Sequence, residues 1–375
     1  MIRTKKFKNE GFLPYYRGKS SRQEAELSVY LRRKFLPLVR RQFPQHGLVQ
    51  HQPAVRLAYI RKHSKTHRFF LRFDVKQFYP SVSQPGVAAA LLENYRRLSG
   101  ITPPTRMQQR VNRGFSSFFA EQPYRFGLPM ATRLSVITGQ ALLLGVCAAL
   151  SEYPFLCFQD DFLVLLPSRA EVDACMCRVV VELDRLGLTL NPAKLSAGRI
   201  AGSVVSFTGF RFAGGAFGID AVKEETFRAK IKSMTSLTCR YSCQAAFIKM
   251  INRAVCGFGH YYKHASVRLA FAQLDAYIRQ RVRRYLVRTR AAGNNAANLN
   301  ISNELLHTVY GLRSLVDIFD GLKRPVATAS VRRAQPVQPA FTMTRTEELL
   351  VHQIKLLKEL LNVERDTNRS LCNYA

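Results

Sequence analysis

The stretch FLCFQDDFLVLL, from Phe155 to Leu166, decides how this chain folds. An apolar run leads into Asp160 and Asp161, and a second apolar run leads out. Consecutive side chains of a regular strand point to opposite faces, so two adjacent aspartates act together only where the chain turns. We therefore expect a β-hairpin that presents two carboxylates at its tip. Neighbouring carboxylates repel one another unless a cation lies between them, and taken alone the pair fits an ordinary acidic turn equally well.

The composition of the chain points to a polyanionic partner. Its 375 residues include 57 Lys and Arg against 25 Asp and Glu, a formal net charge of +32. A balance this basic favours nucleic acid as the partner, with an anionic membrane surface as the second choice. Hydrophobic residues make up 47% of the chain, enough for a large folded core and two or three domains.

Cysteine spacing and hydropathy argue against several other classes of protein. The eight cysteines include no matched CxxC pairs, so we expect reduced thiols and no zinc site. The opening MIRTKKFKNE does not have the pattern of a secretory leader. One apolar window, 134–150, barely reaches bilayer length and contains Ser, Thr and Gln, which favours a buried helix over a membrane span. We therefore expect a cytoplasmic protein.

The N-terminal part is predicted to hold basic side chains that contact phosphates. Apolar residues recur at helical spacing over 23–43 and leave a strongly basic solvent side. Residues 55–73 are predicted to form a hairpin whose basic tip folds over a triphosphate or template phosphates, although a solubilising turn explains that tip equally well. The predicted phosphate-binding side chains are Arg32, Arg33 and Lys34 on the helix and Arg61, Lys62 and Arg68 at the tip.

The middle of the chain alternates strands and helices around acidic positions. The strand FFLRF ends at Asp74, a strand-end position where metal or ligand sites often form. A helix that begins at 131 or 132 starts with free main-chain donors, which can face an anion. The predicted elements are helices over 84–120 (broken at 101–106), from 131 or 132 to 151, and over 170–186, the hairpin over 155–166, a strand and turn over 187–195, and a strand over 204–212.

The C-terminal part is predicted to be helical and basic. The helical pattern runs from 222 to 290, and over 240–290 aromatic rings are interleaved with Lys and Arg, which suits a groove for a nucleic-acid duplex. Heptad-spaced apolar residues within 344–363 form a seam for a second copy, a partner protein or the protein's own surface. The nucleic-acid-binding candidates are Arg253, Tyr261, Tyr262, Lys263, Arg283 and Arg284.

Asp74 taken together with Asp160 and Asp161 predicts a magnesium site. Mg²⁺ takes oxygen ligands and keeps several waters, so two or three carboxylates plus substrate phosphates form its usual site. Two such ions, roughly 4 Å apart, activate a 3′-hydroxyl and stabilise a leaving pyrophosphate. Lys194 is expected to neutralise or protonate that pyrophosphate, and Mn²⁺ is the expected substitute ion.

Five segments, in order, resemble the sequence motifs of reverse transcriptases. FDVKQFYPSV resembles motif A, GLPMATRLSVITGQALL motif B, FQDD motif C, LGLTLNPAKL motif D and FTGFRF motif E. The resemblance implies an α+β fold, the right-hand polymerase, with fingers, a palm built on an antiparallel sheet, a helical thumb and a C-terminal helical tail. Its implied parts are 1–73 (basic N-terminal helix and fingers), 74–215 (palm, with interleaved fingers helices at 84–125), 216–323 (helical thumb and extension), 324–343 (linker) and 344–375 (C-terminal helix).

The resemblance also implies roles for single residues. Tyr79 falls where the family places its steric gate, a ring that clashes with a ribose 2′-hydroxyl and so selects deoxynucleotides. The usual Pro-Gln-Gly of motif B is Pro129-Met130-Ala131 here, so Met130 and Ala131 stand where the family touches the incoming nucleotide and template base. The implied catalytic set is Asp74, Asp160, Asp161 and Lys194, the carbonyl of Val75 assists as a metal ligand, and Gln159 joins the nucleotide-binding residues.

The function implied is RNA-directed DNA synthesis from a primer 3′-hydroxyl, with dNTPs and two Mg²⁺ ions. The compact architecture and altered motif B make the chain most similar to bacterial reverse transcriptases of the retron, abortive-infection and phage-defence lineages, which implies a dedicated non-coding RNA in antiphage defence. A diversity-generating retroelement enzyme and a template-independent or protein-primed DNA polymerase stay open as alternatives. Two rivals are an RNA-synthesising polymerase, against which Tyr79 argues, and an inactive nucleic-acid-binding protein, against which the three aspartates argue.

Overall fold

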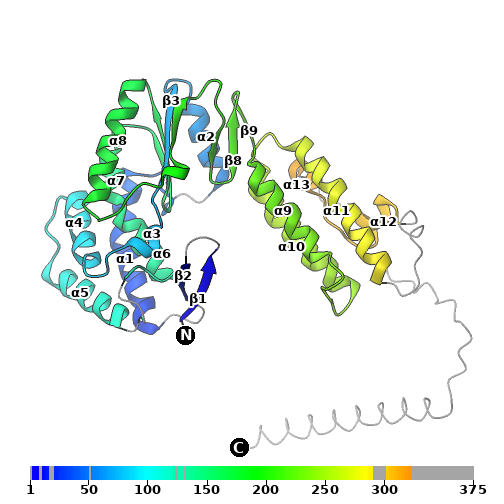
Figure 1. Ribbon diagram of the computed structural model, residues 1–375, viewed down its shortest axis with the longest axis horizontal. Coiled ribbons are helices and arrows are strands. Elements are labelled where there is room, and N and C mark those ends of the chain that lie inside the picture. Colours follow the sequence, from blue (N-terminus) through cyan, green and yellow to red (C-terminus); the bar gives the residue numbers. More distant parts are fainter. Residues whose placement is uncertain are drawn as a thin grey trace, which may run out of the picture. The chain divides into compact units, whose positions relative to one another are not determined.

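The computed structural model of the chain describes most of the residues that precede 322 (Figure 1). They belong to the first of two units into which the chain divides, Met1–Pro325 and Val326–Ala375. The predicted linker, the C-terminal helix with its seam and Ala131 lie outside the described residues. Those described are 2–7 and 11–16, for which only the main chain is discussed, and 21–49, 52–120, 122, 126–130, 132–289 and 301–321.

A four-stranded antiparallel sheet carries the acidic positions. The predicted hairpin is confirmed as its first two strands, and the strand that ends at Asp74 lies beside that hairpin. A fourth strand, which the sequence analysis did not predict, lies along the edge. In the order in which they pair, the strands are β4 (Phe155–Phe158), β5 (Asp161–Leu166), β3 (Phe69–Asp74) and β6 (Ser196–Arg199).

Both faces of the sheet are buried along β3, β4 and β5, whereas the edge strand β6 is exposed. Phe73 and Phe162 lie opposite each other in the register and stack at 4.8 Å between ring centroids, facing the first of two cores. Side chains of the same strands that point to the other face, including Phe70 and Leu163, belong to the second core. Burial on both faces explains why β4 and most of β5 are continuous apolar runs that do not alternate with polar residues.

Helices fill the first core around that face of the sheet, and the predicted helices of this part are confirmed. The apolar window 134–150 forms two short buried helices that meet at Leu143. None of the described helices has the length and hydropathy needed to cross a membrane. The elements are α1 (Arg22–Gln42), α3 (Phe78–Ser81), α4 (Val87–Ser99), α5 (Thr105–Ala120), α6 (Arg133–Leu142), α7 (Leu144–Ala149), α8 (Arg169–Asp184) and the 3₁₀ turn η1 (Pro192–Lys194).

The prediction of a hairpin over 55–73 is wrong. The first half of this segment is a helix, α2 (Pro53–His63), which leads through a loop into β3. Pro53 stands in the first turn, where its fixed φ favours a helix. Leu57 and Ile60, three residues apart, are both buried against the second core. The run of apolar residues in this segment is too short for its spacing to distinguish the 3.6-residue period of a helix from the two-residue period of a strand.

The sequence analysis also did not predict several short strands, which lie at the N-terminus and just before the C-terminal helices. The predicted strand 204–212 is a hairpin, which continues into a third strand. A separate pair forms at the N-terminus of the chain. The strands are β7 (Val205–Phe207), β8 (Phe210–Ala213) and β9 (Ala216–Ile219), and at the N-terminus β1 (Ile2–Phe7) and β2 (Gly11–Tyr16).

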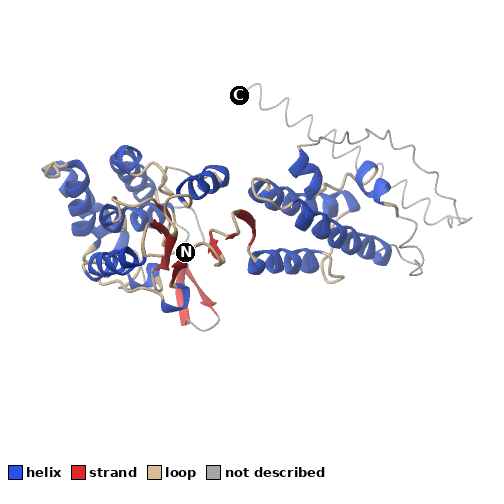
Figure 2. Ribbon diagram, turned by 90° about the horizontal axis from the view of Figure 1, so that it is seen from above, coloured by secondary structure: helices blue, strands red, loops and turns tan. Residues whose placement is uncertain are grey.

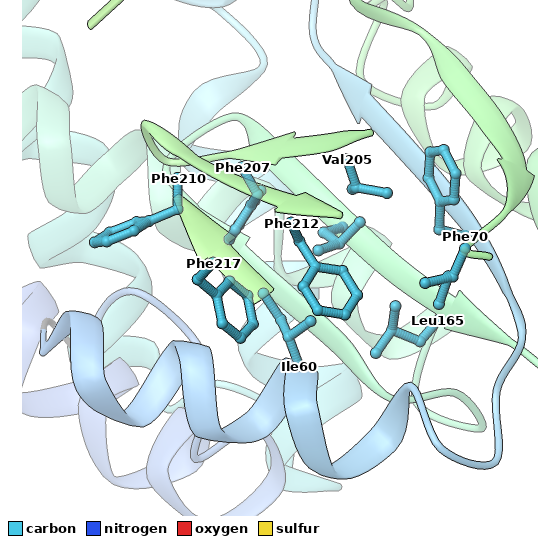
Figure 3. A pocket seen from close by; sticks show the side chains of 10 residues that line it. Ile60, Phe70, Leu165, Val205, Phe207, Phe210, Phe212 and Phe217 are labelled. Carbon is cyan, nitrogen blue, oxygen red and sulfur yellow. The ribbon is translucent and has the colours of Figure 1, made fainter. Parts of the chain in front are cut away.

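The second core joins α2, the sheet and the β7–β9 strands. Aromatic and aliphatic side chains converge there from all three, among them Ile60, Phe70 and Phe212 (Figure 3). The space left between them is about 10 Å³, no more than one water requires. This interior is therefore packing and offers no room for a ligand.

From residue 221 onward the described chain is helical, as predicted (Figure 2). Asp275, 3% exposed, accepts hydrogen bonds from the Ser314 hydroxyl at 2.6 Å and the Leu315 N–H at 2.8 Å. This buried carboxylate therefore fixes the start of the last described helix on α11. The helices are α9 (Ala221–Met234), α10 (Gln244–Tyr262), α11 (Arg268–Thr289), α12 (Asn303–Thr308) and α13 (Leu315–Asp320).

Candidate active site

The sheet brings the three predicted carboxylates to one end of adjacent strands. Asp74 is the last residue of β3 and Asp161 the first of β5, and the two are direct partners in the antiparallel register. Side chains of such partners share a face, with Cβ atoms about 5 Å apart. Asp160 lies in the turn before β5, where Gln159 adopts a φ of 60°. The turn thus breaks the strand alternation that would send Asp160 and Asp161 to opposite faces.

Burial makes the negative charges of this cluster costly. It raises the pKa of Asp160 to about 6, and the charge of Asp74 adds to the shift. Burial also raises the pKa of Asp161, although Arg72 opposes the shift because its Nε donates a hydrogen bond to Asp161 Oδ1 at 3.2 Å. The sequence analysis missed Arg72, yet its position two residues before Asp74 on the same strand places it on the same face.

Lys194 and Asn191 hold the carboxylate of Asp74. Lys194 Nζ lies 2.8 Å from Asp74 Oδ2, and Asn191 Nδ2 donates to Oδ1 at 3.2 Å. Burial alone would lower the pKa of Lys194, but the hydrogen bond and the charge of Asp74 outweigh it and raise that pKa. The lysine side chain is 53% exposed, so water screens much of this attraction. Asn191 was not predicted, because nothing in the sequence links it to Asp74.

The main chain at Val75 is oriented toward the hairpin. Val75 and Leu190 are partners in an antiparallel bridge. The hydrogen bonds of this bridge are made by the residues on either side: the Asn191 N–H donates to the Asp74 carbonyl, and the Lys76 N–H donates to the Thr189 carbonyl. Val75 and Leu190 therefore form a non-hydrogen-bonded pair. In such a pair, both main-chain groups point away from the partner strand. The Val75 carbonyl therefore points to the side of β5, where the Asp160 turn lies.

The chemistry of these donors fits a divalent cation. Three carboxylates and a carbonyl are the oxygen ligands that Mg²⁺ prefers, and the raised pKa values of Asp160 and Asp161 indicate negative charge that a cation would stabilise. The carboxylates are not gathered around a single point, because Lys194 holds Asp74 and Arg72 holds Asp161. An ion bound here therefore competes with two cationic side chains.

A second cluster of potential ligands lies in the first core. His46, Cys147 and Cys157 are buried, with ligand atoms within 4.8 Å of one another. His46 Nδ1 accepts a hydrogen bond from the Leu48 N–H at 3.0 Å, so the neutral ring carries its proton on Nε2. A metal-binding histidine instead donates from its second nitrogen while the first ligates. This cluster therefore does not fit a metal site.

Tyr79 lies beside the loop that precedes α6. The Leu128 N–H donates to the Tyr79 carbonyl at 2.7 Å. Gly127, at a φ of 73°, packs so closely that a Cβ there would lie 2.9 Å from the same carbonyl. Burial, together with the charge of Asp160, raises the pKa of Tyr79 to about 12. The ring therefore stays neutral at the edge of the carboxylate cluster.

The start of α6 is not an open anion site. Thr132 and Ser135 are buried, and the Ser135 N–H donates to the Thr132 hydroxyl at 2.9 Å. The donors that were expected to face an anion are thus partly used by the helix's own cap. Met130, just before this cap, is half-buried.

The structure does not bring Arg61, Lys62 and Arg68 to the carboxylates. Arg68 precedes the first residue of β3, whereas Asp74 is its last, so about 20 Å of strand separates them. Arg61 and Lys62 lie in the last turn of α2, which leads to the same far end. Arg61 instead covers the Phe217 ring, 5.4 Å from its centroid. The predicted triphosphate tip fails because the segment is a helix and not a hairpin.

Two of the predicted nucleic-acid-binding residues on α10 and α11 have structural roles. Tyr262 is 5% exposed and packs against Phe210 in the second core, with the two rings tilted and their centroids 4.9 Å apart. Arg283 donates to the Ile301 carbonyl at 2.6 Å and to the Asn303 side chain. Exposure cannot be read from residue type, so the sequence did not show that Tyr262 is buried. The remaining candidates keep exposed or half-buried side chains: Arg32, Arg33, Lys34, Arg253, Tyr261, Lys263 and Arg284.

Arg56 of α2 is a residue that the sequence analysis missed. It is 3% exposed, covers the Phe158 ring 4.8 Å from its centroid, and donates to the Tyr261 hydroxyl at 3.3 Å. Tyr261 in turn donates to the Thr208 carbonyl at 2.8 Å. Arg56 Nε and Nη1 have no hydrogen-bond partner among the residues that the structure describes. This buried cation therefore ties the strand that leads into the Asp160 turn to the β7–β8 turn and α10.

Models of two protein families match the chain. The model for reverse transcriptase (RNA-dependent DNA polymerase) matches residues 30–217, and that for the group II intron, maturase-specific domain matches residues 225–300. The sequence analysis expected a thumb over the second region but did not identify this domain. No curated protein matches the chain.

Solved telomerase structures are similar to the chain at low identity. Telomerase from Candida albicans in complex with the TWJ fragment of telomeric RNA has a TM-score of 0.40 and 12% identity, covering 80% of this chain and 57% of that chain. Apo telomerase from Candida tropicalis has a TM-score of 0.44 and 13% identity, covering 79% and 55%. The chain thus spans a little over half the length of these telomerase chains.

Proposed function

Because this chain belongs to the reverse transcriptase (RNA-dependent DNA polymerase) family, we propose that it extends a primer 3′-hydroxyl with deoxynucleotides along an RNA template. The single observation that carries the proposal is the Asp74–Asp161 partnership on β3 and β5 with Asp160 in the adjoining turn. A purely binding protein has no need of three carboxylates that cost free energy to bury together. The net charge of +32 supports a nucleic-acid substrate.

In the proposed reaction the carboxylates hold two divalent cations. When bound, such ions lower the pKa of the attacking hydroxyl and stabilise the charge of the leaving pyrophosphate. Asp74, Asp160 and the Val75 carbonyl would hold these ions, and Asp161 would complete the acidic cluster. Lys194, half exposed beside Asp74, is free to turn toward the leaving group and give it a proton.

Tyr79 sets the choice of sugar in this proposal. The Leu128 hydrogen bond to its carbonyl holds the main chain of Tyr79, and its ring packs edge-on against Phe78, with 5.3 Å between ring centroids. A fixed ring rejects an added hydroxyl sterically, whereas a mobile ring yields to it. We therefore propose selection of deoxynucleotides.

The maturase-specific match supports a structured RNA as the partner of the helical region after 221. This match favours an enzyme that works on one dedicated RNA, which agrees with the expected non-coding RNA. The narrower assignment to bacterial retron and antiphage-defence lineages rests on the compact architecture and the altered motif B, and it stays a prediction. A loss of phage resistance on deletion of the coding sequence would support it.

Template copying is tested with the purified full chain, a primed RNA of defined sequence, Mg²⁺ and labelled dNTPs. We expect a DNA product complementary to the RNA, with no product in EDTA and little from rNTPs. Sequencing of nucleic acid that co-purifies with the protein identifies the natural template. Products unrelated to the supplied RNA would overturn templated synthesis in favour of untemplated addition.

A further inference from the structure

A groove of about 370 Å³ lies between α1 and α5, two helices that lie side by side (Figure 1). The helices come close where Gly114 faces Leu27, because a Cβ on Gly114 would lie 2.8 Å from Leu27 Cδ2. Leu27, 4% exposed, closes the floor. The groove shares no residue with the carboxylate site.

One wall of the groove is strongly basic. Arg106, Arg110 and Arg113 line it from α5, and their spacing of four and three residues puts them on one face of the helix. All three side chains are exposed, and none forms an ion pair with a described residue. The helix itself contains no Asp or Glu. Three like charges on one helix face repel one another unless an anion lies among them.

The opposite wall adds little negative charge. Glu26 is the acidic residue that lines the groove, and its Oε1 already accepts a hydrogen bond from Arg22 Nε at 2.9 Å. The basic wall also continues onto α1. The Arg110 guanidinium covers the Tyr30 ring at 4.5 Å from its centroid, and Lys34 Nζ lies 5.8 Å from the same centroid. The cations of the two helices therefore form one continuous surface around Tyr30.

We propose that the α1–α5 groove binds the sugar–phosphate backbone of the RNA partner at a position separate from the catalytic carboxylates. The proposal rests on the proposed function for the existence of that partner. Arginine forks match phosphate oxygens, and the wide basic wall offers one to each of several phosphates. Gln23, Gln109 and Ser117 line the same groove and offer neutral donors and acceptors, which suit ribose 2′-hydroxyls and favour RNA over DNA.

The test compares RNA binding by the full chain and by two charge-matched triple variants. The groove variant is Arg106→Gln/Arg110→Gln/Arg113→Gln. The control, Arg96→Gln/Arg169→Gln/Arg178→Gln, removes the same charge from exposed arginines that already pair with carboxylates.

Affinity for a single-stranded RNA is measured over a range of salt concentrations. We expect the groove variant to bind at least 10-fold more weakly, with a log–log salt slope smaller by about 2, near 0.7 for each lost phosphate contact. The control should match the wild type.

A second variant tests whether removing a negative charge from the groove strengthens RNA binding. Glu26→Gln removes the acidic side chain of the groove and frees Arg22, so it should tighten RNA binding, whereas Glu93→Gln, which frees Arg96 outside the groove, should not. Equal binding by the groove and control variants would overturn the inference. Equal losses for RNA and for DNA of the same sequence would overturn the choice of RNA. Primer extension by the same preparations distinguishes either result from a failure of the proposed polymerase function.

Discussion

Asp74 and Asp161 are register partners on the neighbouring strands β3 and β5, and each carboxylate pairs with a different basic side chain. Lys194 lies 2.8 Å from Asp74, and Arg72 lies 3.2 Å from Asp161. Because both faces of β3 and β5 are buried, a shift of register would move every apolar side chain of these two strands to the wrong core. The pair is therefore fixed by packing, while its charge is balanced by side chains that can move aside.

Asp160→Asn is expected to stabilise the metal-free protein at neutral pH. Asp160 has a folded-state pKa of about 6, above its ordinary 3.8, so the folded state binds this proton more tightly than the unfolded chain does. The contribution of Asp160 to the free energy of unfolding is thus most favourable below pH 4 and declines as the pH rises through 4 to 6. Thermal unfolding in EDTA should give the variant an advantage of about 1–2 kcal/mol at pH 7.5 that shrinks by pH 5.

The control for that measurement is Asp184→Asn, which changes an exposed aspartate on α8. We expect it to leave the melting temperature unchanged at both pH values. Mg²⁺ at pH 7.5 should stabilise the wild type more than Asp160→Asn. An Asp160→Asn protein that is less stable than the wild type in EDTA at pH 7.5 would refute the electrostatic cost assigned to this carboxylate.

Lys194→Met separates two roles of the lysine. If Lys194 protonates the leaving pyrophosphate, kcat falls by about 100-fold even at saturating Mg²⁺. If it only neutralises Asp74, the variant keeps its kcat and binds Mg²⁺ more tightly, because the competing cation is gone. We expect the first result, measured by steady-state kinetics over a Mg²⁺ titration. Lys230→Met, on the exposed side of α9, is the matched control and should behave as the wild type.

Tyr79→Ala should relax the choice between deoxy- and ribonucleotides. The expected change is a fall of about 10- to 100-fold in the ratio of kcat/KM for a dNTP to that for the matching rNTP, because a void replaces the ring that excludes the 2′-hydroxyl. Tyr79→Phe retains the ring and should retain the preference. The steric role would be wrong if the alanine and phenylalanine variants discriminated equally.

Arg56→Met tests the buried tie between the hairpin and α10. Replacing a buried, incompletely paired cation by an apolar side chain of similar volume is often neutral or stabilising, by about 1–4 kcal/mol. We expect an unchanged or higher melting temperature but a kcat/KM lower by about 10- to 100-fold, because Phe158 and Tyr261 lose their common anchor. Arg61→Met, on the same helix, should alter neither. A variant with full activity would show that Arg56 only fills space.

Much of the fold was predictable because its signals are local. The acidic hairpin, the long helices and the buried window 134–150 each follow from apolar periodicity and turn residues within one segment. Short elements were not predictable in this way. The four-residue strand SAGR of β6 has no apolar pattern, and the apolar residues of α2 are too few to distinguish a helix from a strand.

The candidate site was predictable as far as the aspartates. Their residue type and strand ends indicate a shared metal, whereas the partners that hold them come from long-range contacts. Asn191 lies 117 positions from Asp74, and only the pairing of Val75 with Leu190 brings them together. The exposure of individual side chains could not be predicted from the sequence either, since Tyr261 and Tyr262 are adjacent in sequence but only Tyr262 is buried.

The central claim is that the carboxylates at the ends of β3 and β5 perform metal-dependent DNA synthesis. Its most direct test is primer extension on an RNA template by Asp160→Asn/Asp161→Asn, beside Asp173→Asn/Asp184→Asn, which removes the same charge from exposed positions on α8. Circular dichroism establishes that both variants are folded. We predict no detectable extension by the first variant at any Mg²⁺ or Mn²⁺ concentration and wild-type extension by the second. Equal extension by the two variants would contradict the assignment of the active site.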